Sequence, residues 1–161
     1  MTAVVAAVLL LYSFETDAQF KAWQVEDELK DKVQLSVVEE HATDGKKALK
    51  MVLKPHDWPG AFTTSLPKDW SAYAQLKFDV FAEEGADINV RIDDEASKDY
   101  ESRYNSGANF CNKGANTVTL WLSDVGAKVD LKKIKAMYIF SGNVQKDLTF
   151  YIDNIRLVKA K

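Results

Sequence analysis

Arg91 and Asp93 are the two residues whose spacing points most directly to binding chemistry. In the segment DINVRIDD, residues 87–94, the apolar residues Ile88, Val90 and Ile92 alternate with polar ones. Arg91 and Asp93 therefore lie on the same face of a predicted strand. A guanidinium beside a carboxylate can both donate to and accept from the hydroxyl groups of a sugar. The same two residues can also form an ordinary ion pair on a solvated face, and the sequence leaves both interpretations open.

Further candidates for sugar contact are polar and aromatic residues in two nearby segments. KDYESRYNSG, residues 98–107, contains Tyr100, Arg103 and Asn105. Polar groups of these kinds bond sugar hydroxyls, and an aromatic ring stacks on the apolar face of a sugar. Trp58 lies in HDWPGAF, a turn before a strand, where its ring can stand at the lip of a cleft or serve a structural role.

Two other aromatic residues are assigned by the phase of their strands. KAMYIFSG, residues 135–142, is apolar on both faces, so Tyr138 and Phe140 point outward if Met137 and Ile139 point inward. Tyr138 is then a predicted stacking platform. Trp121 also points outward, but we predict that its strand belongs to the opposite sheet, where it covers an edge or a subunit contact.

Asp153 raises a different question. It interrupts the β-prone segment TFYIDNIRLV, residues 149–158. A carboxylate in such a strand needs a partner, because an uncompensated buried charge is costly. The sequence therefore predicts a specific partner for the Asp153 carboxylate, either an ion or a group of hydrogen-bond donors.

Catalysis is not favoured by the remaining residues. The chain has only two histidines, His41 and His56, without the spacing of metal ligands. There is no glycine-rich phosphate loop and no nucleophile elbow. Asp93, Asp94 and Glu95 are adjacent in sequence, whereas a glycosidase needs two carboxyl groups across a cleft. We therefore expect a non-catalytic protein.

The elements that must position these residues are predominantly strands. Apolar and polar residues alternate with a period of two, and turn sequences such as TDGKK and NKGAN separate the alternating segments. Helical periodicity appears only around residues 17–24. Short strands at this spacing predict an all-β fold, an antiparallel β-sandwich or jelly roll. The segments predicted as strands are residues 47–54, 74–81, 87–94, 116–122 and 149–158.

Composition sets the class of protein. A chain of 161 residues with 47% hydrophobic and 28% charged residues predicts one globular domain. A net charge of −3 with scattered Lys and Arg disfavours nucleic acid and anionic membranes as partners. The apolar run at residues 3–11 is too short for a membrane span. We predict that residues 1–8 are the remnant of a signal peptide, a linker or a cloning sequence, and that residues 9–161 form the domain. A simple extension of the first strand is the alternative, and either a neighbouring copy of the chain or the edge of the sheet would cover the run.

An ordered set of segments carries a family resemblance over roughly residues 10–158. LYSFETDAQFKAW, EHATDGKKALKMVL, DWSAYAQLKFDVF, VRIDD, NTVTLWLSDV and LTFYIDNIRLV occur in that order. Together they resemble the galactose-binding-like jelly rolls that serve as carbohydrate-binding modules on polysaccharide-degrading enzymes. The resemblance implies a non-catalytic β-sandwich with a concave, glycan-binding sheet and a structural calcium ion. It also implies that Trp23, Trp70 and Tyr73 are core residues.

The same resemblance implies which residues hold calcium. They are Glu15, the turn of residues 44–46 formed by Asp44, Gly45 and Lys46, and Asp153, with Asp17 as a further candidate. Calcium takes its ligands from carboxylate and carbonyl oxygens. This chain reads ETDAQ where the family often has a glycine near position 17 or 18. The alternative is that Asp153 accepts hydrogen bonds from backbone amides while Asp44 shapes a turn.

These expectations combine into two function classes. The first is a secreted, extracellular or periplasmic module that binds a glycan for a fused or associated hydrolase. Its candidate contacts are Trp58, Arg91, Asp93, Tyr100, Arg103 and Tyr138. The second is a protein-interaction or architectural β-sandwich of a secreted protein that binds no sugar. Fold alone does not decide between them.

Overall fold

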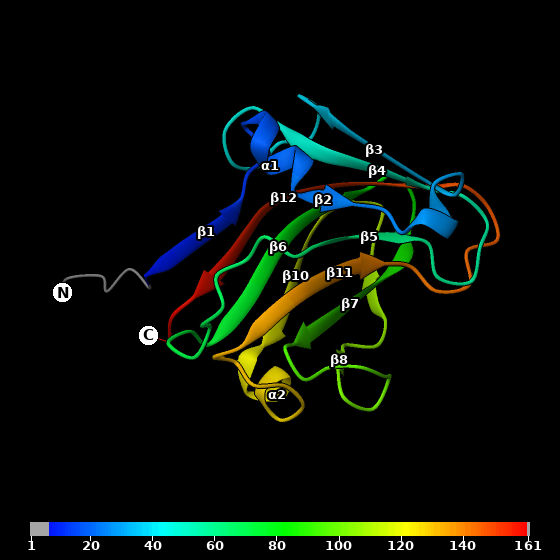
Figure 1. Ribbon diagram of the computed structural model, residues 1–161. Coiled ribbons are helices and arrows are strands. Elements are labelled where there is room, and N and C mark those ends of the chain that lie inside the picture. The colour runs from blue at the N-terminus through cyan, green and yellow to red at the C-terminus, as the bar shows by residue number, and fades with distance from the viewer. Residues whose placement is uncertain (1–6, 161) are drawn as a thin grey trace.

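The computed structural model describes residues 7–160, which form a sandwich of two antiparallel β-sheets (Figure 1). Sheet 1 has the order β10-β6-β12-β4-β3, and β1 also pairs with β12. Its strands are β1 (Val8–Tyr12), β3 (Val33–Val38), β4 (Ala48–Leu53), β6 (Gln75–Ala82), β10 (Gly114–Trp121) and β12 (Leu148–Val158). The predicted all-β sandwich is therefore confirmed.

Sheet 2 has the order β2-β5-β11-β7-β8, and β9 also pairs with β7. Its strands are β2 (Trp23–Gln24), β5 (Gly60–Thr63), β7 (Ala86–Asp94), β8 (Tyr104–Asn105), β9 (Asn109–Cys111) and β11 (Ile134–Phe140). Each segment that the sequence predicted as a strand contributes to one of the two sheets.

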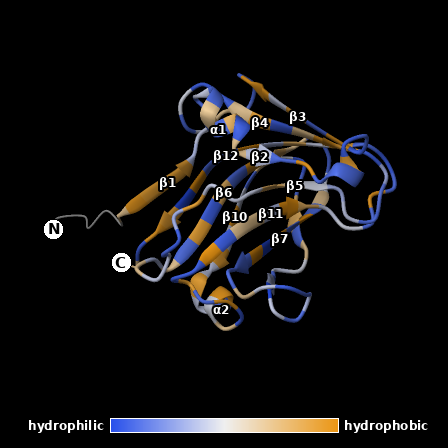
Figure 2. Cartoon of the chain, in the orientation of Figure 1, coloured by the Kyte–Doolittle hydropathy of each residue, from blue (hydrophilic) through white to orange (hydrophobic). Residues whose placement is uncertain are grey.

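The register of sheet 1 explains why its alternating sequence buries one face. Leu120, Leu76 and Leu157 lie directly opposite one another on β10, β6 and β12, and all three are buried. Residues directly opposite in a sheet share a face, so this row points into the sandwich. The row next to it contains Trp121 and Val8, each 54% exposed. Figure 2 shows the alternation as bands of hydrophobic and hydrophilic residues along the strands. Trp121 therefore points outward from the sheet opposite the predicted binding surface, as expected.

The helices are short. α1 (Asp17–Lys21) begins after Thr16, whose hydroxyl accepts from the Gln19 amide, and α2 (Leu122–Gly126) follows β10. A 3₁₀ turn, η1, spans Asp27–Leu29. The observed helix is shorter than the one predicted around residues 17–24, because Trp23 and Gln24 pair with β5 instead. Among the described residues, no helix is long and apolar enough to cross a membrane.

The aromatic core matches the sequence prediction. Trp23 and Trp70 are buried, and Tyr73 packs against the core from its edge. Tyr12 and Phe14 pack around Trp23, with ring centroids 5.6 Å and 6.2 Å from its ring. These contacts hold Tyr12, at the end of the first strand, and Phe14 against the core.

The two ends of the described chain lie side by side (Figure 1). Val8 on β1 is opposite Val158 on β12, and the Lys159 amide donates to the Ala7 carbonyl. The first strand therefore begins one residue before the predicted domain boundary. The prediction for residues 1–8 falls largely on residues 1–6, which lie outside the described residues, and it stays a prediction.

Candidate functional site

A cleft of about 730 Å³ lies on the outer face of sheet 2. The alternation along β7 and β11 places outward-facing side chains along its floor, and the loops before β5 and after β7 form its rim. Five of the six predicted ligand contacts line it, together with Asn105 and Phe140. Those five are Trp58, Arg91, Tyr100, Arg103 and Tyr138.

The floor of the cleft is a row of side chains at one register. Phe62 on β5 is opposite Tyr138 on β11, which is opposite Arg91 on β7, which is opposite Asn105 on β8. Because directly opposite residues share a face, all four point to the cleft. Residues far apart in the sequence thus form one continuous surface across four strands.

Arg91 is held in place by Asp93. Arg91 Nε donates to Asp93 Oδ1 at 2.8 Å, and Nη2 donates to Asp93 Oδ2 at 2.6 Å. The two side chains are 23% and 11% exposed. Burial alone would lower the pKa of Arg91, but the paired Asp93 carboxylate outweighs it and raises that pKa. The pair is therefore a fixed bidentate ion pair, in which Arg91 keeps N–H donors for a ligand while Asp93 orients it.

Tyr138 contributes its hydroxyl rather than a ring face. The Phe62 ring stacks on it with centroids 4.9 Å apart, and the Arg91 guanidinium carbon lies 4.1 Å from its ring centroid. Phe62 and Arg91 come from the strands on either side of β11, so they cover opposite faces of the ring. Burial raises the pKa of Tyr138, which keeps the phenol neutral. Tyr138 lines the cleft as predicted, but it offers no free stacking platform.

Trp58 is the aromatic side chain that stands at the lip of the cleft. It is 61% exposed, and its ring meets Phe140 edge-on at 5.9 Å. The ring packs over Gly142, where a Cβ atom would come within 2.7 Å of it. The Trp58 amide donates to Nδ1 of His56 at 3.2 Å. A large ring held in this way at a cleft edge suits stacking on a sugar.

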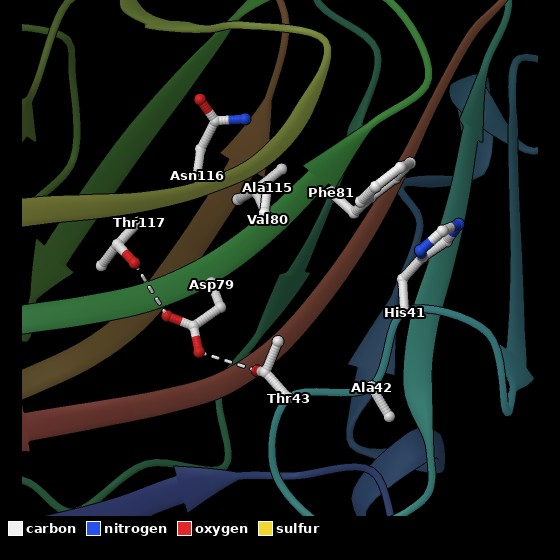
Figure 3. A pocket seen from close by; sticks show the side chains of 9 residues that line it. All are labelled: His41, Ala42, Thr43, Asp79, Val80, Phe81, Ala115, Asn116 and Thr117. Carbon is white, nitrogen blue, oxygen red and sulfur yellow. Dashed lines mark hydrogen bonds between the residues drawn. The ribbon is translucent and has the colours of Figure 1, made fainter.

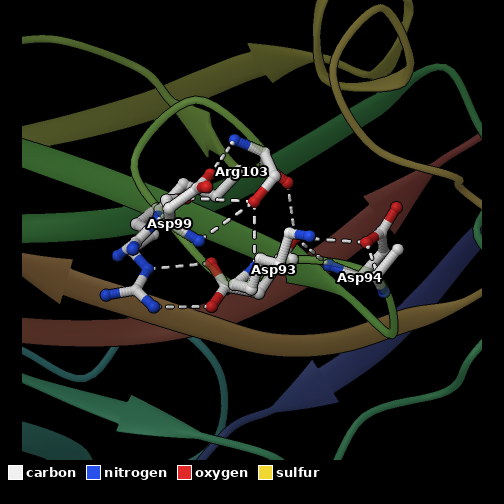
Figure 4. A network of polar contacts seen from close by, with 9 residues as sticks. Asp93, Asp94, Asp99 and Arg103 are labelled. Carbon is white, nitrogen blue, oxygen red and sulfur yellow. Dashed lines mark hydrogen bonds and ion pairs between the residues drawn. The ribbon is translucent and has the colours of Figure 1, made fainter.

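The loop after β7 carries the opposite rim and is fixed by an internal network (Figure 4). Asp94 accepts from the amides of Ala96 and Asp130 and from the Ser97 hydroxyl. Burial alone would raise the pKa of Asp94, but these donors outweigh it and lower that pKa. The Asp94 carboxylate is thus a structural hydrogen-bond acceptor at the beginning of the loop.

The end of the same loop holds Arg103 and Tyr100. Arg103 Nε donates to the Asp99 carbonyl at 2.7 Å, and the Ser102 amide donates to Asp99 Oδ1 at 2.9 Å. Tyr100, at the loop tip, is 69% exposed. Tyr100 and Arg103 are therefore presented to the cleft by an ordered loop.

The three adjacent carboxylates near this loop each have their own partner. Asp93 bonds Arg91, Asp94 bonds amides within the loop, and Glu95 pairs with Lys68 at 2.8 Å. None of the three lines the cleft. They do not form the opposed pair of carboxyl groups that glycoside hydrolysis requires.

Asp153 is bound by backbone amides at the opposite sheet. Its Oδ2 accepts from the Thr43 amide at 2.8 Å and the Asp44 amide at 2.9 Å, and Oδ1 accepts from the Asn154 amide at 2.7 Å. The residue is 1% exposed. Burial raises the pKa of Asp153 in spite of these amides. The partner of Asp153 within the described residues is therefore the loop before β4.

Glu15 binds the same loop a few residues further on. Its Oε1 accepts from the amides of Lys46 and Lys47 at 2.9 Å and 2.8 Å. The carboxylate lies over Gly45, which has φ +70°, and a Cβ atom there would come within 2.5 Å of the carboxyl carbon. Gly45 thus provides both the left-handed turn and the space for Glu15. The structure brings together Glu15, the loop and Asp153, as predicted, whereas Asp17 makes no hydrogen bond to them.

Backbone amides already bind the carboxylates at which calcium is predicted. Five backbone N–H groups point at the carboxylate oxygens of Glu15 and Asp153, and a cation would have to face oxygens instead. No cluster of three or more acidic, histidine or cysteine residues suited to a metal occurs within residues 7–160. The contacts match the alternative in which Asp153 accepts from amides. The calcium ion stays a prediction.

Sequence reasoning missed several residues of the cleft. Phe62 supports Tyr138, Asn89 is opposite Phe140, and Glu26 and Leu29 contribute from the segment around η1. Asn89 points outward in the same strand alternation as Arg91, so the sequence could have predicted that it lines the cleft. Phe62 and Glu26 gave none, because only the pairing of distant strands brings them to the cleft.

Comparisons with known proteins identify the fold. No protein-family model and no curated protein sequence matches this chain. Solved structures do match over almost the whole chain. The family 11 carbohydrate-binding module from Clostridium thermocellum, in complex with a β-1,3-1,4-mixed-linked tetrasaccharide, has a TM-score of 0.73 and 16% identity. The match covers 98% of both chains.

Two other structures extend this comparison. The CBM22-1 xylan-binding domain from Paenibacillus barcinonensis has a TM-score of 0.64, 16% identity and 97% coverage of both chains. An exo-β-agarase has a TM-score of 0.75 and 18% identity, and the match covers 94% of this chain but 25% of that one. The resemblance to carbohydrate-binding modules is thus confirmed at the level of the fold, which in the agarase forms one part of a longer protein.

Proposed function

We propose that this chain is a non-catalytic carbohydrate-binding module that binds a polysaccharide or oligosaccharide in the cleft of sheet 2. The observation that carries the proposal is the cleft itself. It combines an exposed tryptophan at the lip, Arg91 on the floor, where Asp93 holds it, and further polar groups at the rim. Apolar ring surface with a few fixed polar groups is the composition expected of a sugar site. The shared fold with carbohydrate-binding modules supports it.

The binding chemistry divides between two kinds of contact. The Trp58 ring stacks on the C–H face of a sugar, and the free N–H groups of Arg91 bond neighbouring hydroxyls. Tyr138 donates or accepts through its hydroxyl. Because Arg91, Tyr138 and the loop of residues 95–103 are already fixed by the protein, binding requires little ordering of side chains.

Affinity electrophoresis against soluble β-1,3-1,4-glucan, xylan and agarose-derived oligosaccharides tests the proposal. We expect retardation by at least one glycan, and loss of that retardation in Trp58→Ala. Trp121→Ala is the matched control, because Trp121 is also largely exposed, at 54% against 61% for Trp58, but lies on sheet 1. No retardation by any glycan, or equal effects of the two substitutions, would favour the alternative of a protein-interaction or architectural domain.

Three further properties belong to the same proposal. The module is secreted, extracellular or periplasmic, and it serves a fused or associated hydrolase, as suggested by the agarase in which this fold is one part of the chain. A structural calcium ion at the loop of residues 43–47 would be held by Glu15, Asp153 and oxygens of the turn of residues 44–46. None of these properties is needed for sugar binding in the cleft.

Self-association through the apolar first strand is also proposed. Val8 and Leu10 on β1 are 54% and 43% exposed, and within residues 7–160 β1 pairs only with β12. An uncharged strand with an open edge can pair with a second copy of itself. Light scattering should show a dimer that Leu10→Lys converts to a monomer. A monomer at all concentrations in the unmodified protein would contradict this proposal.

A further inference from the structure

A second groove, of about 470 Å³, lies on the outer face of sheet 1, away from the cleft (Figure 3). It runs between the loop that follows β3 and the first half of β10, over the outer face of β6. The lining residues that contribute aromatic surface, space or polar groups are His41, Thr43, Asp79, Phe81, Ala115 and Thr117. The proposed function makes no use of it.

Phe81 provides the apolar surface of this groove. On β6 it lies between Ala115 of β10 and Tyr151 of β12, each directly opposite it. His41 covers the ring from the β12 side, with centroids 3.5 Å apart and an interplanar angle of 7°. His41 also meets the Tyr151 ring edge-on at 4.6 Å. The imidazole therefore fixes Phe81 by occupying one of its two faces.

The other face of Phe81 is open to the groove. The neighbour on that side is Ala115, whose side chain is a single exposed methyl group. A small residue opposite a large ring leaves ring surface uncovered. This differs from the cleft floor, where Tyr138 has Phe62 on one face and Arg91 on the other.

Asp79 provides the polar centre of the groove. The Thr43 hydroxyl donates to its Oδ2 at 2.7 Å, and the Thr117 hydroxyl donates to its Oδ1 at 3.1 Å. Asn154 and Arg156 donate to the same carboxylate at 3.2 Å each. With four donors the carboxylate has no free acceptor site.

The two threonine oxygens remain available to a ligand as acceptors. Each gives its proton to the carboxylate and keeps lone pairs as an acceptor. A hydroxyl that donates to a negative group becomes a better acceptor, because hydrogen bonds in a chain polarise one another. Two such oxygens, one on each side of Asp79 and both near an open aromatic face, match two neighbouring hydroxyl donors on a ring with an apolar face.

We infer that this groove is a second sugar-binding site, which takes a pyranose unit of the same class of glycan as the cleft. This inference rests on the proposed function. The C–H face of the sugar packs on Phe81, and two hydroxyls donate to Thr43 and Thr117. With one ring face and two acceptors, the groove binds more weakly than the cleft. Two sites on opposite sheets allow one module to contact two chains of a polysaccharide.

A ¹H–¹⁵N NMR titration of the whole chain separates the two sites. The probes are the β-1,3-1,4-linked tetrasaccharide, a xylo-oligosaccharide and an agaro-oligosaccharide. We expect amides of Asn89, Arg91 and Tyr138 to shift at low concentration, and those of Asn116 and Thr117 to shift at about tenfold higher concentration or more. Movement of the cleft amides alone overturns the second site and leaves the proposed function intact. Movement of neither set overturns both.

Two variants assign the weaker set of shifts to the groove. Ala115→Gln fills the space beside Phe81, and Thr117→Val removes one acceptor while keeping the shape of the strand. Each should weaken the groove set at least tenfold and leave the cleft set unchanged. Ala127→Gln, at another exposed alanine, which follows α2, is the matched control. Groove shifts that persist unchanged in both variants would overturn the inference.

Discussion

Asp93 and Asp153 are both buried carboxylates on long strands, but they bind different kinds of partner. Asp93, on sheet 2, bonds a side chain that faces the cleft, whereas Asp153, on sheet 1, bonds backbone amides of a loop. A side-chain partner can turn its remaining donors to a ligand, whereas a backbone amide is committed to holding the chain. The same residue type therefore supports binding in one region and anchors a loop in the other.

The largest expected effect is on stability at the loop anchored by Asp153. Asp153→Ala leaves the amides of Thr43 and Asp44 without their acceptor, and each buried unsatisfied group costs about 1–3 kcal/mol. We expect the free energy of unfolding to fall by about 3 kcal/mol in urea denaturation, with glycan affinity unchanged in the fraction that stays folded. Asp147→Ala, on an exposed aspartate, is the control. A loss of sugar affinity without a loss of stability would break the comparison.

Arg91→Ala should show the reverse pattern. Losing a hydrogen bond from a charged group costs about 1.5–3 kcal/mol. Glycan affinity in the cleft should therefore fall about ten- to a hundredfold. The sequence alone suggested that stability would hardly change if Arg91 were exposed. Because the side chain is 23% exposed and Asp93 loses its partner, we expect a stability loss of about 1–2 kcal/mol as well.

The double variant Arg91→Ala/Asp93→Ala separates these two effects. Removing both charges eliminates the uncompensated carboxylate, so most of the stability should return. The affinity should not return, because the donors of Arg91 are still absent. Isothermal titration calorimetry and urea denaturation measure the two quantities. Recovery of affinity in the double variant would show that Arg91 is only a structural partner of Asp93.

The pH dependence of stability should distinguish the two carboxylates that amides hold, Asp94 and Asp153. The pKa of Asp94 is lowered in the folded state, so its ionisation adds stability that is lost as pH falls through the folded pKa. The pKa of Asp153 is raised, mainly by burial, so its ionisation reduces stability as pH rises from the ordinary pKa through the folded pKa. The two groups therefore act in opposite directions across the acid range.

Asparagine variants isolate these contributions, because asparagine does not titrate. In unfolding measured from acid to neutral pH, the cost of Asp94→Asn should grow as pH rises. The cost of Asp153→Asn should shrink over the same range. Parallel curves for the two variants would contradict the assigned directions.

The sequence predicted the parts of the site that depend on local periodicity. The alternation along residues 87–94 placed Arg91 and Asp93 on one face, and the phase of residues 135–142 placed Tyr138 in the same cleft. Register between distant strands has no local signal. For that reason the sequence did not show that Phe62 and Arg91 cover both faces of Tyr138.

The anchored loop shows the same limit. The family resemblance brought Glu15, the loop and Asp153 together, but hydrogen-bond direction depends on how the backbone of residues 43–47 turns. Likewise, the short α1 ends early because pairing of Trp23 with β5 outweighs the weak helical pattern of residues 17–24. In each case a long-range contact decided what local preference left open.

The smallest expected effect is that of calcium. If the ion binds as the sequence predicts, calcium should raise the melting midpoint above that measured after exhaustive chelation. Asp153→Ala should abolish the rise, and Asp17→Ala should reduce it only if Asp17 is a ligand. Because amides already bond Glu15 Oε1 and both oxygens of Asp153, the loop is anchored without the ion, so the rise should be small. A midpoint that does not change between chelator and excess calcium would contradict the calcium prediction. The amide-held loop would then be the complete answer to what Asp153 binds.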